Sequence, residues 1–476
     1  MILSDLAPLM PFIIIAASPV IIMLALSFCR SCVLAYVLTL CGIVASLISL
    51  FVISPLVPRR ITPILLVDGY ALCFLGLILA ASFVTAVLSY DYFKDRKGNP
   101  EEYYILLLLA VLGSSVLVAS SHFASFFLGL EVLSVSLYAL IGYTRNELSI
   151  EAGVKYLVLA ATSAAFLLFG IALLYGEAGT MDFSLLGPRL LSGSVNSFVV
   201  VTGLAMVVVG IGFKLAVAPF HMWTADVYEG APAPVTAFVA TVSKGAMFAL
   251  LLRYSVKVEM HAQSSLFAAF AVIAILSMFT GNLLALLQDN VKRILAYSSI
   301  AHLGYLLVAF LSSGPMRVTA VTFYLVAYFI TTLGAFGVVT VLSGKERDAD
   351  AMDDYRGLAK HRPWLAGIFS AMLFSLAGIP LTAGFIGKFY IIAAGIGSAL
   401  WLLVITLVIN SAIGLFYYLR IIVAMYSCTA GEAEALPSLS LRGGLMLAFL
   451  TVLLIWLGIY PGPLLQTISF MTGGSL

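Results

Sequence analysis

The chain has 476 residues, of which 62% are hydrophobic and only 10% are charged, and its mean hydropathy is +1.13. This composition excludes a soluble domain built around a buried core and indicates an integral membrane protein, for which the lipid bilayer is the main solvent. The net charge is only +2, and no basic cluster is interleaved with aromatic residues, so a nucleic-acid partner is excluded as well.

The first ten residues, MILSDLAPLM, contain an acid but no Lys or Arg. They lack the positively charged region of a cleaved signal peptide, so we expect the first apolar run to remain as a membrane span. A spanning helix needs about 20 apolar residues, and runs of that length recur along the chain. The longest polar stretch between them, residues 343–363, is expected to be a loop. The runs predict fourteen spans, near residues 8–29, 32–54, 67–90, 103–119, 121–143, 154–176, 197–220, 234–254, 265–287, 293–312, 317–343, 363–393, 400–427 and 441–461.

The distribution of Lys and Arg over the loops predicts the orientation in the membrane. Of the 24 basic residues, fourteen fall in the loops of one face, from Arg30 to Arg442, and six in the loops of the other face, from Arg59 to Arg317. Because cytoplasmic loops carry the excess of positive charge, the first face is predicted to be cytoplasmic, and an even number of spans leaves both termini on the outer side. The four remaining basic residues lie within predicted spans: Lys155, Lys214, Lys244 and Lys388.

Several ionisable residues are predicted to lie deep in the membrane. Glu131 and Lys244 stand about ten residues into their spans, which places each ~15 Å deep, near the middle of a ~30 Å hydrocarbon core. His302 lies at a similar depth, whereas Lys155 is shallower and can extend its ammonium toward the cytoplasmic interface. Such a residue costs ~2.5–3.5 kcal/mol at the centre of a span. Several at one depth therefore indicate a polar pathway across the helix bundle.

Two predicted spans contain a proline close to a buried lysine. Segment 197–220 meets Pro219 soon after Lys214, and Pro380 divides segment 363–393 before Lys388. Proline frees backbone carbonyls, which are tolerated at membrane depth only where they line a buried or hydrated cavity. The pattern resembles the paired discontinuous helices of inverted-repeat transporters. It predicts two inverted repeats of five spans each, residues 103–254 and 265–427, with a three-helix segment (1–102) before them and one helix (441–476) after them.

The buried lysines suggest a proton relay. Burial disfavours the charged form of a lysine and a nearby carboxylate favours it, so a change at Glu131 would alter whether Lys214 holds its proton. Protons would then pass by way of water among Lys214, Lys244, His302 and Lys388, each binding and releasing one in turn. Histidine suits such a relay because it titrates near neutral pH.

Structural roles remain open for the same residues. A buried pair of Glu131 and Lys214 can serve only to fix the register of two helices, and His302 can be a packing residue whose nitrogens are satisfied. Three further residues are expected to cap helices or form pairs at the interface: Lys155, Asp226 and Glu229.

No cofactor site is predicted in this chain. The five cysteines, at positions 29, 32, 41, 73 and 428, are scattered, and the CxxC pair Cys29 and Cys32 has no second pair or histidine nearby to complete a metal site. There is no glycine-rich dinucleotide fingerprint after a strand and no P-loop. Any redox chemistry is therefore expected in a partner.

Four stretches carry a resemblance to a known family. FFLGLEVLSVSLYALIGY (126–143), PFHMWTADVYEGAPAPVTAFVATVSK (219–244), NVKRILAYSSIAHLGYLL (290–307) and SLAGIPLTAGFIGKFY (375–390) resemble the subunit N family, antiporter-like membrane subunits of proton-pumping NADH:quinone oxidoreductase, respiratory complex I. The resemblance covers essentially the whole chain. It implies fourteen transmembrane helices with two inverted five-helix repeats.

The resemblance also implies a role for each candidate site residue. Glu131 matches the acid of the fifth helix and pairs with Lys214 of the broken seventh. Lys244 matches the central lysine of the eighth helix, His302 the histidine of the tenth, and Lys388 the lysine of the broken twelfth helix on the exit side. One larger antiporter-like subunit continues into a long lateral helix, and another has a glutamate in place of Lys388; both differences favour subunit N.

The resemblance implies that the chain is a translocase subunit without bond chemistry of its own. NADH, flavin, iron–sulfur clusters and quinone are expected in partner subunits, and the partners would be other membrane-arm subunits, including another antiporter-like subunit and small membrane subunits, in a bacterial plasma membrane. Two other classes remain as alternatives. One is a subunit of a cation/proton antiporter complex. The other is a quinone-binding anchor, which is disfavoured because the polar groups are spread over several helices and do not converge on one headgroup pocket.

Overall fold

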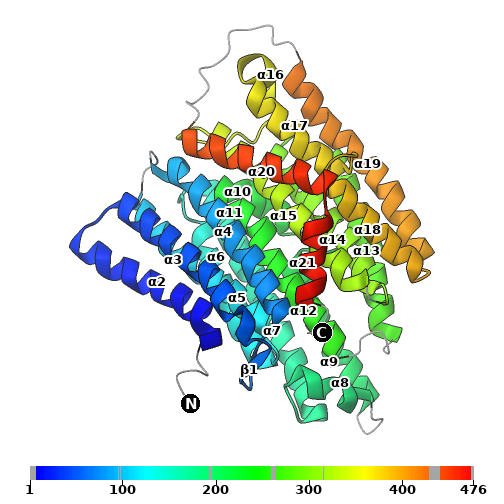
Figure 1. Cartoon of the computed structure of the whole chain (residues 1–476). Coiled ribbons are helices and arrows are strands. Elements are labelled where there is room, and N and C mark those ends of the chain that lie inside the picture. The colour runs from blue at the N-terminus through cyan, green and yellow to red at the C-terminus, as the bar shows by residue number, and fades with distance from the viewer. Residues whose placement is uncertain are drawn as a thin grey trace.

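Helices account for most of the backbone in the computed structural model of the chain (Figure 1). Within the part of the chain that the structure describes, thirteen helices are long and apolar enough to cross a membrane, and two shorter apolar helices, α17 (Pro363–Ala377) and α18 (Ala383–Gly397), follow one another where a fourteenth span was predicted. The prediction of an all-α polytopic protein with about fourteen spans is therefore confirmed. The structure describes residues 7–94, 96, 98–191, 196–258, 264–314, 316–427 and 440–472.

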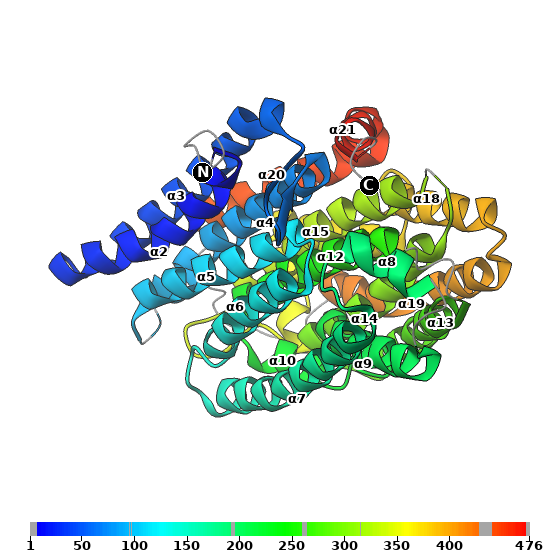
Figure 2. The ribbon, with the colours of Figure 1, turned by 90° about the horizontal axis from the view of Figure 1, so that it is seen from below.

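The first spans, α2 and α3, lie at one edge of the molecule (Figure 2). Between the second and third spans the chain forms a small antiparallel hairpin that was not predicted, because its strands are too short for an alternating pattern to stand out in the sequence. The elements of this segment are η1 (Ala7–Leu9), α2 (Met10–Phe28), α3 (Cys32–Ile53), η2 (Ser54–Leu56), β1 (Arg59–Thr62), β2 (Leu65–Val67) and α4 (Gly69–Lys94).

The segment that covers the next five predicted spans contains nine elements, because one span is broken, another includes a π-helical turn, η3, and short helices lie between spans. The short helix α8 was not predicted, since it is far shorter than a span. These elements are α5 (Pro100–Ala119), α6 (Phe123–Ile141), α7 (Glu147–Ala178), α8 (Phe183–Leu191), α9 (Ser197–Leu215), α10 (Thr224–Gly230), α11 (Ala233–Phe238), η3 (Val239–Ser243) and α12 (Lys244–Lys257).

The following five spans again include one broken helix, formed by α17 and α18. The polar stretch 343–363 is a loop as predicted, but it contains two short helical turns, η5 and α16. A short helix, α21, follows the last predicted span. The remaining elements are α13 (Ser264–Leu286), α14 (Val291–Leu311), α15 (Met316–Leu342), η5 (Met352–Tyr355), α16 (Leu358–His361), α19 (Trp401–Tyr426), α20 (Leu441–Ile459) and α21 (Gly462–Thr472).

Both predicted helix breaks are present. Helix α9 ends at Leu215, where Ala216 adopts a left-handed conformation with φ of 58°, and Pro219 follows in the turn before α10. Helix α17 ends at Ala377, the capping residue Gly378 has φ of 87°, and Pro380 lies between α17 and α18. A left-handed residue closes each helix end, and proline cannot donate a hydrogen bond to continue the helix.

The same kind of backbone bridge between two loops occurs twice in the chain. The chain before α6 pairs with the chain before α8, and the chain before α14 pairs with the chain before η5, each as an isolated antiparallel bridge. The first bridge adjoins α8 at the lower end of the molecule in Figure 1, and the second lies close in sequence to α16 at the upper end. The hydrogen bonds are Phe123 N to Met181 O (3.0 Å), Phe183 N to Ser121 O (3.1 Å), Val291 N to Asp350 O (2.6 Å) and Met352 N to Asp289 O (3.2 Å).

The core of the bundle is formed by the central spans. Segment Ala233–Lys257 and helices α14 and α15 are buried along almost their whole apolar length, whereas only a third of the apolar length of α2 and α3 is buried. Helix α12 accordingly lies in the middle of the molecule in Figure 2. The buried charged residues on α12 and α14, Lys244, Arg253 and Lys292, are therefore enclosed by protein and must find their polar partners there.

The close packing of α5 on α6 predicts that a substitution at Gly113 of α5 destabilises the fold, whereas one at Gly176 of α7 does not. A Cβ at Gly113 would stand 2.5 Å from the backbone nitrogen of Leu133 on α6, whereas a Cβ at Gly176 on α7 meets nothing within 4 Å. Gly113→Ala should lower the unfolding free energy of the detergent-solubilised chain by about 1–3 kcal/mol through overpacking. Gly176→Ala should leave it unchanged or raise it by up to about 1 kcal/mol. Equal thermal stability of the two variants would contradict the close approach of α5 and α6.

Candidate functional site

Lys214 lies in the last turn of α9, directly before the helix break, and its side chain is buried. Its ammonium donates hydrogen bonds to the hydroxyl of Tyr156 on α7 (2.8 Å) and to that of Ser134 on α6 (3.1 Å). The ammonium also lies 5.5 Å from the centre of the Tyr156 ring. The partners of this charge are thus neutral hydroxyl groups and an aromatic face.

Glu131 lies on α6 one turn before Ser134, so the two side chains share a face of the helix. Its carboxylate is partly buried and is close enough to Lys214 for the two charges to interact. Among the residues that the structure describes, however, no ion pair joins Glu131 and Lys214 within 4.0 Å. Ser134 is the group that connects the helix of the acid to the lysine.

Lys244 begins α12, directly after the π-helical turn η3. Such turns are rare and occur frequently at functional sites. The side chain is only 1% exposed, and its ammonium donates to the hydroxyl of Ser299 on α14 (2.6 Å) and lies 5.2 Å from the centre of the Tyr228 ring. Ser299 in turn accepts a hydrogen bond from Tyr328 on α15 (2.9 Å).

His302 lies one turn beyond Ser299 on α14, and both of its ring nitrogens have partners. Nδ1 is 2.7 Å from the hydroxyl of Tyr324, and Nε2 is 3.1 Å from that of Tyr418. A neutral imidazole donates from one nitrogen and accepts at the other, and the tyrosine hydroxyls serve either arrangement. The imidazole can therefore exchange its proton between two sides without losing a hydrogen bond.

Lys388 on α18 reaches back to the end of α17. Its ammonium donates to the carbonyls of Leu376 (2.9 Å) and Ala377 (2.8 Å), which the helix break leaves free, and to the hydroxyl of Ser411 on α19 (2.8 Å). The last carbonyls of a helix carry partial negative charge and favour a cation there. A cavity of about 310 Å³ adjoins this site, lined in part by Gly378, Lys388 and Ser411.

The ring of Tyr305 lies close to both His302 and Lys388. Its ring centre is 5.4 Å from that of His302, and the ammonium of Lys388 lies 5.2 Å from the same ring centre. With the Ser299 and Tyr328 contacts, the structure thus brings Lys244, His302 and Lys388 together. Lys214 stands apart, because within the described part of the chain no hydrogen bond links its partners on α6 and α7 to the Lys244 group.

The pairing expected for Lys155, Asp226 and Glu229 is confirmed. Lys155 contacts Asp226 (2.7 Å), and Arg293 of α14 contacts both Asp226 (3.0 Å) and Glu229 (2.6 Å). These ion pairs tie α7 and α10 to the beginning of α14. The side chains are between about a quarter and two-fifths exposed, so they form a boundary between the buried groups and solvent.

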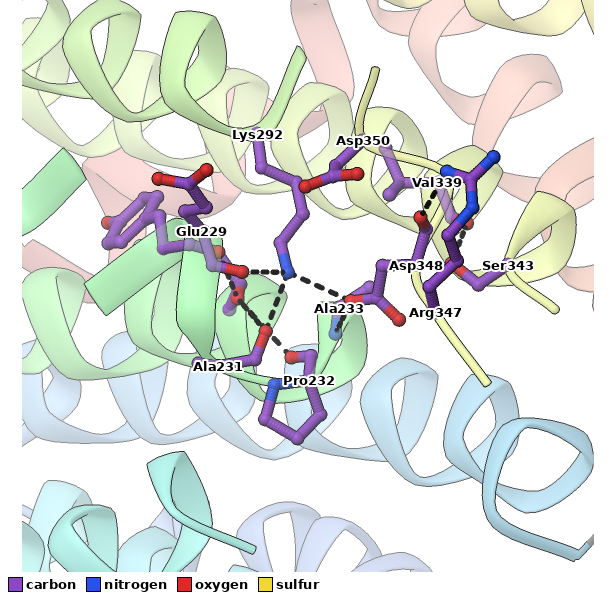
Figure 3. Close-up of polar contacts among 12 residues, drawn as sticks. Glu229, Ala231, Pro232, Ala233, Lys292, Val339, Ser343, Arg347, Asp348 and Asp350 are labelled. Atoms are coloured by element: carbon purple, nitrogen blue, oxygen red, sulfur yellow. Dashed lines mark hydrogen bonds and ion pairs between the residues drawn. The ribbon is translucent and has the colours of Figure 1, made fainter. Parts of the chain in front are cut away.

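Several charged residues near the ends of the predicted spans are buried. Arg253 is fully buried and forms a two-pronged ion pair with Asp68, with distances of 2.9 and 2.7 Å. Lys292 is 1% exposed and contacts Asp348 of the 343–363 loop (2.8 Å) (Figure 3). Burial alone would raise the pKa of the Asp348 carboxyl, but Lys292 and Arg96 together lower that pKa below its usual value.

These residues left only a weak signal in the sequence. Each stands at the edge of an apolar run, where a basic residue is ordinarily solvated, and its acidic partner is distant along the chain. The cysteines add no chemistry to this site: Cys29 and Cys32 are free thiols, and Cys428 lies outside the described residues. The described residues also contain no group of three or more His, Cys, Asp or Glu side chains placed to hold a metal ion.

Comparison with known proteins defines the class. Residues 120–414 match the family described as NADH:quinone oxidoreductase/Mrp antiporter, TM. Two curated relatives are NADH-quinone oxidoreductase subunit N of Nitrosospira multiformis, 54% identical with 99% of this chain and 97% of the relative covered, and subunit N of Ectopseudomonas mendocina, 47% identical with 98% and 96% covered. The chain is thus an antiporter-like membrane subunit.

Solved structures agree. A chain of respiratory complex I from Thermus thermophilus is 33% identical, with 96% of this chain and 99% of that chain covered and a TM-score of 0.83. A chain of the Mrp complex from Dietzia sp. is 20% identical, with coverage of 100% and 98% and a TM-score of 0.86, and shares the fold. The chain belongs to the subunit N family of NADH-quinone oxidoreductase, the antiporter-like membrane subunits of bacterial respiratory complex I.

The cavity beside Lys388 predicts bound water. The free carbonyls of α17, the Lys388 ammonium and the Ser411 hydroxyl supply polar partners, and about 310 Å³ is ample for several water molecules. A high-resolution density map should show ordered water within hydrogen-bond distance of Lys388. The apolar cavity between α2 and α3, about 360 Å³, is lined mostly by aliphatic side chains and should be dry of ordered water. A dry cavity beside Lys388 would contradict a hydrated path there.

Proposed function

We propose that the chain translocates protons within bacterial respiratory complex I through a relay of five residues: Glu131, Lys214, Lys244, His302 and Lys388. The observation that carries this proposal is that the three lysines and the histidine are buried while their hydrogen-bond partners are neutral hydroxyls and helix-end carbonyls. The chain itself performs no bond chemistry. Quinone reduction elsewhere in the complex would drive the charge movements.

Neutral partners allow a buried lysine to give up its proton. An ammonium paired with a carboxylate is held in its charged form, whereas Lys244 donates to the Ser299 hydroxyl, which can donate to the neutral amine once the proton has left. His302 between two tyrosine hydroxyls has the same property. Glu131 would act as the adjustable charge, since its movement toward or away from Lys214 changes the stability of the ammonium.

The relay must be interrupted at some point in each cycle. Moving one charge across 100 mV costs ~2.3 kcal/mol, so a continuously conducting path would dissipate the membrane potential. The missing hydrogen-bond link between the Lys214 and Lys244 groups is a suitable place for this interruption. Water entering between them would connect the two groups, and Lys388 beside its cavity would release the proton.

We further infer that the chain contains two inverted repeats, residues 103–254 and 265–427, between a three-helix segment (1–102) and a final helix (441–476). The repeated bridge supports this division, because its two copies stand at equivalent points of the two segments and at opposite ends of the molecule in Figure 1. Each segment also contains one broken helix. The excess of basic residues in alternate loops supports both termini on the outer side of the plasma membrane.

The partners inferred for the chain are other membrane-arm subunits of complex I, including another antiporter-like subunit and small membrane subunits, together with the lipid bilayer. NADH, flavin, iron–sulfur clusters and quinone would be bound by partner subunits. A quinone-binding role for this chain is disfavoured, because a cavity of about 700 Å³ between α4, α15 and α20 is lined by apolar side chains and Thr467 and offers few polar groups for a quinone headgroup.

A second candidate is a subunit of a cation/proton antiporter complex. The fold likeness to a chain of the Mrp complex is the observation that favours it. Sodium-dependent proton exchange in vesicles that contain this chain, without any redox substrate, would support that reading. Exchange that depends on NADH oxidation would support complex I.

Loss of a relay group should slow pumping without preventing assembly. In the complete complex, Lys214→Ala or Glu131→Gln should lower NADH-driven proton pumping and coupled quinone reduction by about tenfold, which corresponds to a barrier raised by ~1.4 kcal/mol. Lys360→Ala, at an exposed loop lysine, is the matched control and should leave both rates unchanged. An assembled Lys214→Ala complex that pumps at the normal rate would remove Lys214 from the relay.

A further inference from the structure

The junction between α10 and α11 is a third break in the helices, in addition to those after α9 and α17. Helix α10 ends at Gly230 and α11 begins at Ala233, with Pro232 between them. Because helix ends leave backbone groups without helical partners, the carbonyls of Glu229 and Ala231 and the amide N–H of Ala233 need partners from elsewhere. Directly after α11, the chain passes through the turn η3 that leads to Lys244.

Lys292 of α14 binds this junction (Figure 3). Its ammonium donates to the carbonyls of Glu229 (2.8 Å) and Ala231 (2.7 Å) and to the carboxylate of Asp348 (2.8 Å). These three bonds use all three protons of the ammonium. With a side chain that is 1% exposed, Lys292 is anchored to the end of α10 rather than solvated at the surface.

Asp348 holds the other side of the same junction. The oxygen that accepts from Lys292 also accepts the amide N–H of Ala233, the first residue of α11 (3.1 Å). Its second oxygen accepts from the Tyr92 hydroxyl (2.6 Å), near the end of α4, and from Arg96 (3.0 Å), which follows α4. Lys292 and Asp348 thus form a clamp that joins α10, α11, α14 and α4.

The clamp lies on the same helices as the contact between Lys244 and Ser299. Lys292 and Ser299 are two turns apart on one face of α14, and Lys244 follows α11 and η3 in one continuous helical segment. The two segments are therefore joined at a shallow point by the clamp and at a deeper point by the 2.6 Å hydrogen bond. Since packed helices move as nearly rigid elements, a shift at the clamp changes the deeper contact.

We propose that Lys292 and Asp348 are positioning residues that hold Lys244 against Ser299 and thereby set the rate of proton transfer at Lys244. The inference rests on the proposed relay role of Lys244. Neither member of the clamp exchanges a proton in this role: the ammonium stays bound to carbonyls and a carboxylate, and the carboxylate stays bound to four donors. Their effect on pumping passes through the geometry of another residue.

A double-mutant cycle in the assembled complex tests this coupling. Lys292→Met removes the three donors and keeps most of the side-chain length, and it should lower NADH-driven proton pumping about tenfold, as expected when hydrogen bonds of a charged group are lost. Ser299→Ala should also lower it. In the Ser299→Ala background, Lys292→Met should cause less than about twofold further loss, because coupled residues are non-additive. If the fold-losses of the two single variants multiply in the double variant, the proposal is overturned.

Controls separate the clamp from general damage and from the relay itself. Arg347→Gln removes an ion pair between the exposed Arg347 side chain and Asp354 in the same loop and should leave pumping unchanged. In the Lys244→Met background, Lys292→Met should cause no further loss of pumping. If Lys244→Met pumps normally, the relay role fails; if only Lys292→Met pumps normally, the clamp alone fails. If the Lys292→Met complex does not assemble, Asp348→Asn replaces it in the same double-mutant cycle with Ser299→Ala. A loss of pumping in the double variant that is smaller than the product of the two single losses supports the proposal, and a loss equal to that product contradicts it.

Discussion

A lysine ammonium inside a membrane protein must find hydrogen-bond acceptors within the protein, and this requirement explains most of the unusual backbone of the chain. An ordinary apolar helix offers none, because its carbonyls are all used internally. The break after α17 frees the carbonyls that bind Lys388, and the junction between α10 and α11 frees those that bind Lys292. Two of the helix breaks are thus sites where a buried lysine is accommodated.

The buried basic residues fall into two groups according to their partners. Lys214 and Lys244 donate to hydroxyl groups, which tolerate loss of the lysine proton. Arg253 and Lys292 instead contact the carboxylates of Asp68 and Asp348, which hold a positive charge in place. We interpret the first group as the residues that exchange protons and the second as the residues that fix the helices around them.

The sequence predicts well those features that depend on local composition. Apolar length predicts the spans, and Pro219 and Pro380 predict the two broken helices, because proline acts on its own backbone neighbours. Contacts between distant segments are not accessible in this way. The partnership of Lys292 with Asp348 requires that a loop fold back over α14. Likewise, the residue of α6 that contacts Lys214 is Ser134 rather than Glu131, which depends on how α6 packs against α9.

The most direct measurement is proton pumping by an assembled complex in which the neutral partner of Lys244 is replaced by a permanent charge. Ser299→Asp would hold Lys244 as an ammonium, whereas Ser299→Thr keeps a hydroxyl at the same place. If neutral partners are what allow the proton to move, NADH-driven pumping is lost in Ser299→Asp and retained in Ser299→Thr. Normal pumping by an assembled Ser299→Asp complex would contradict the relay through Lys244.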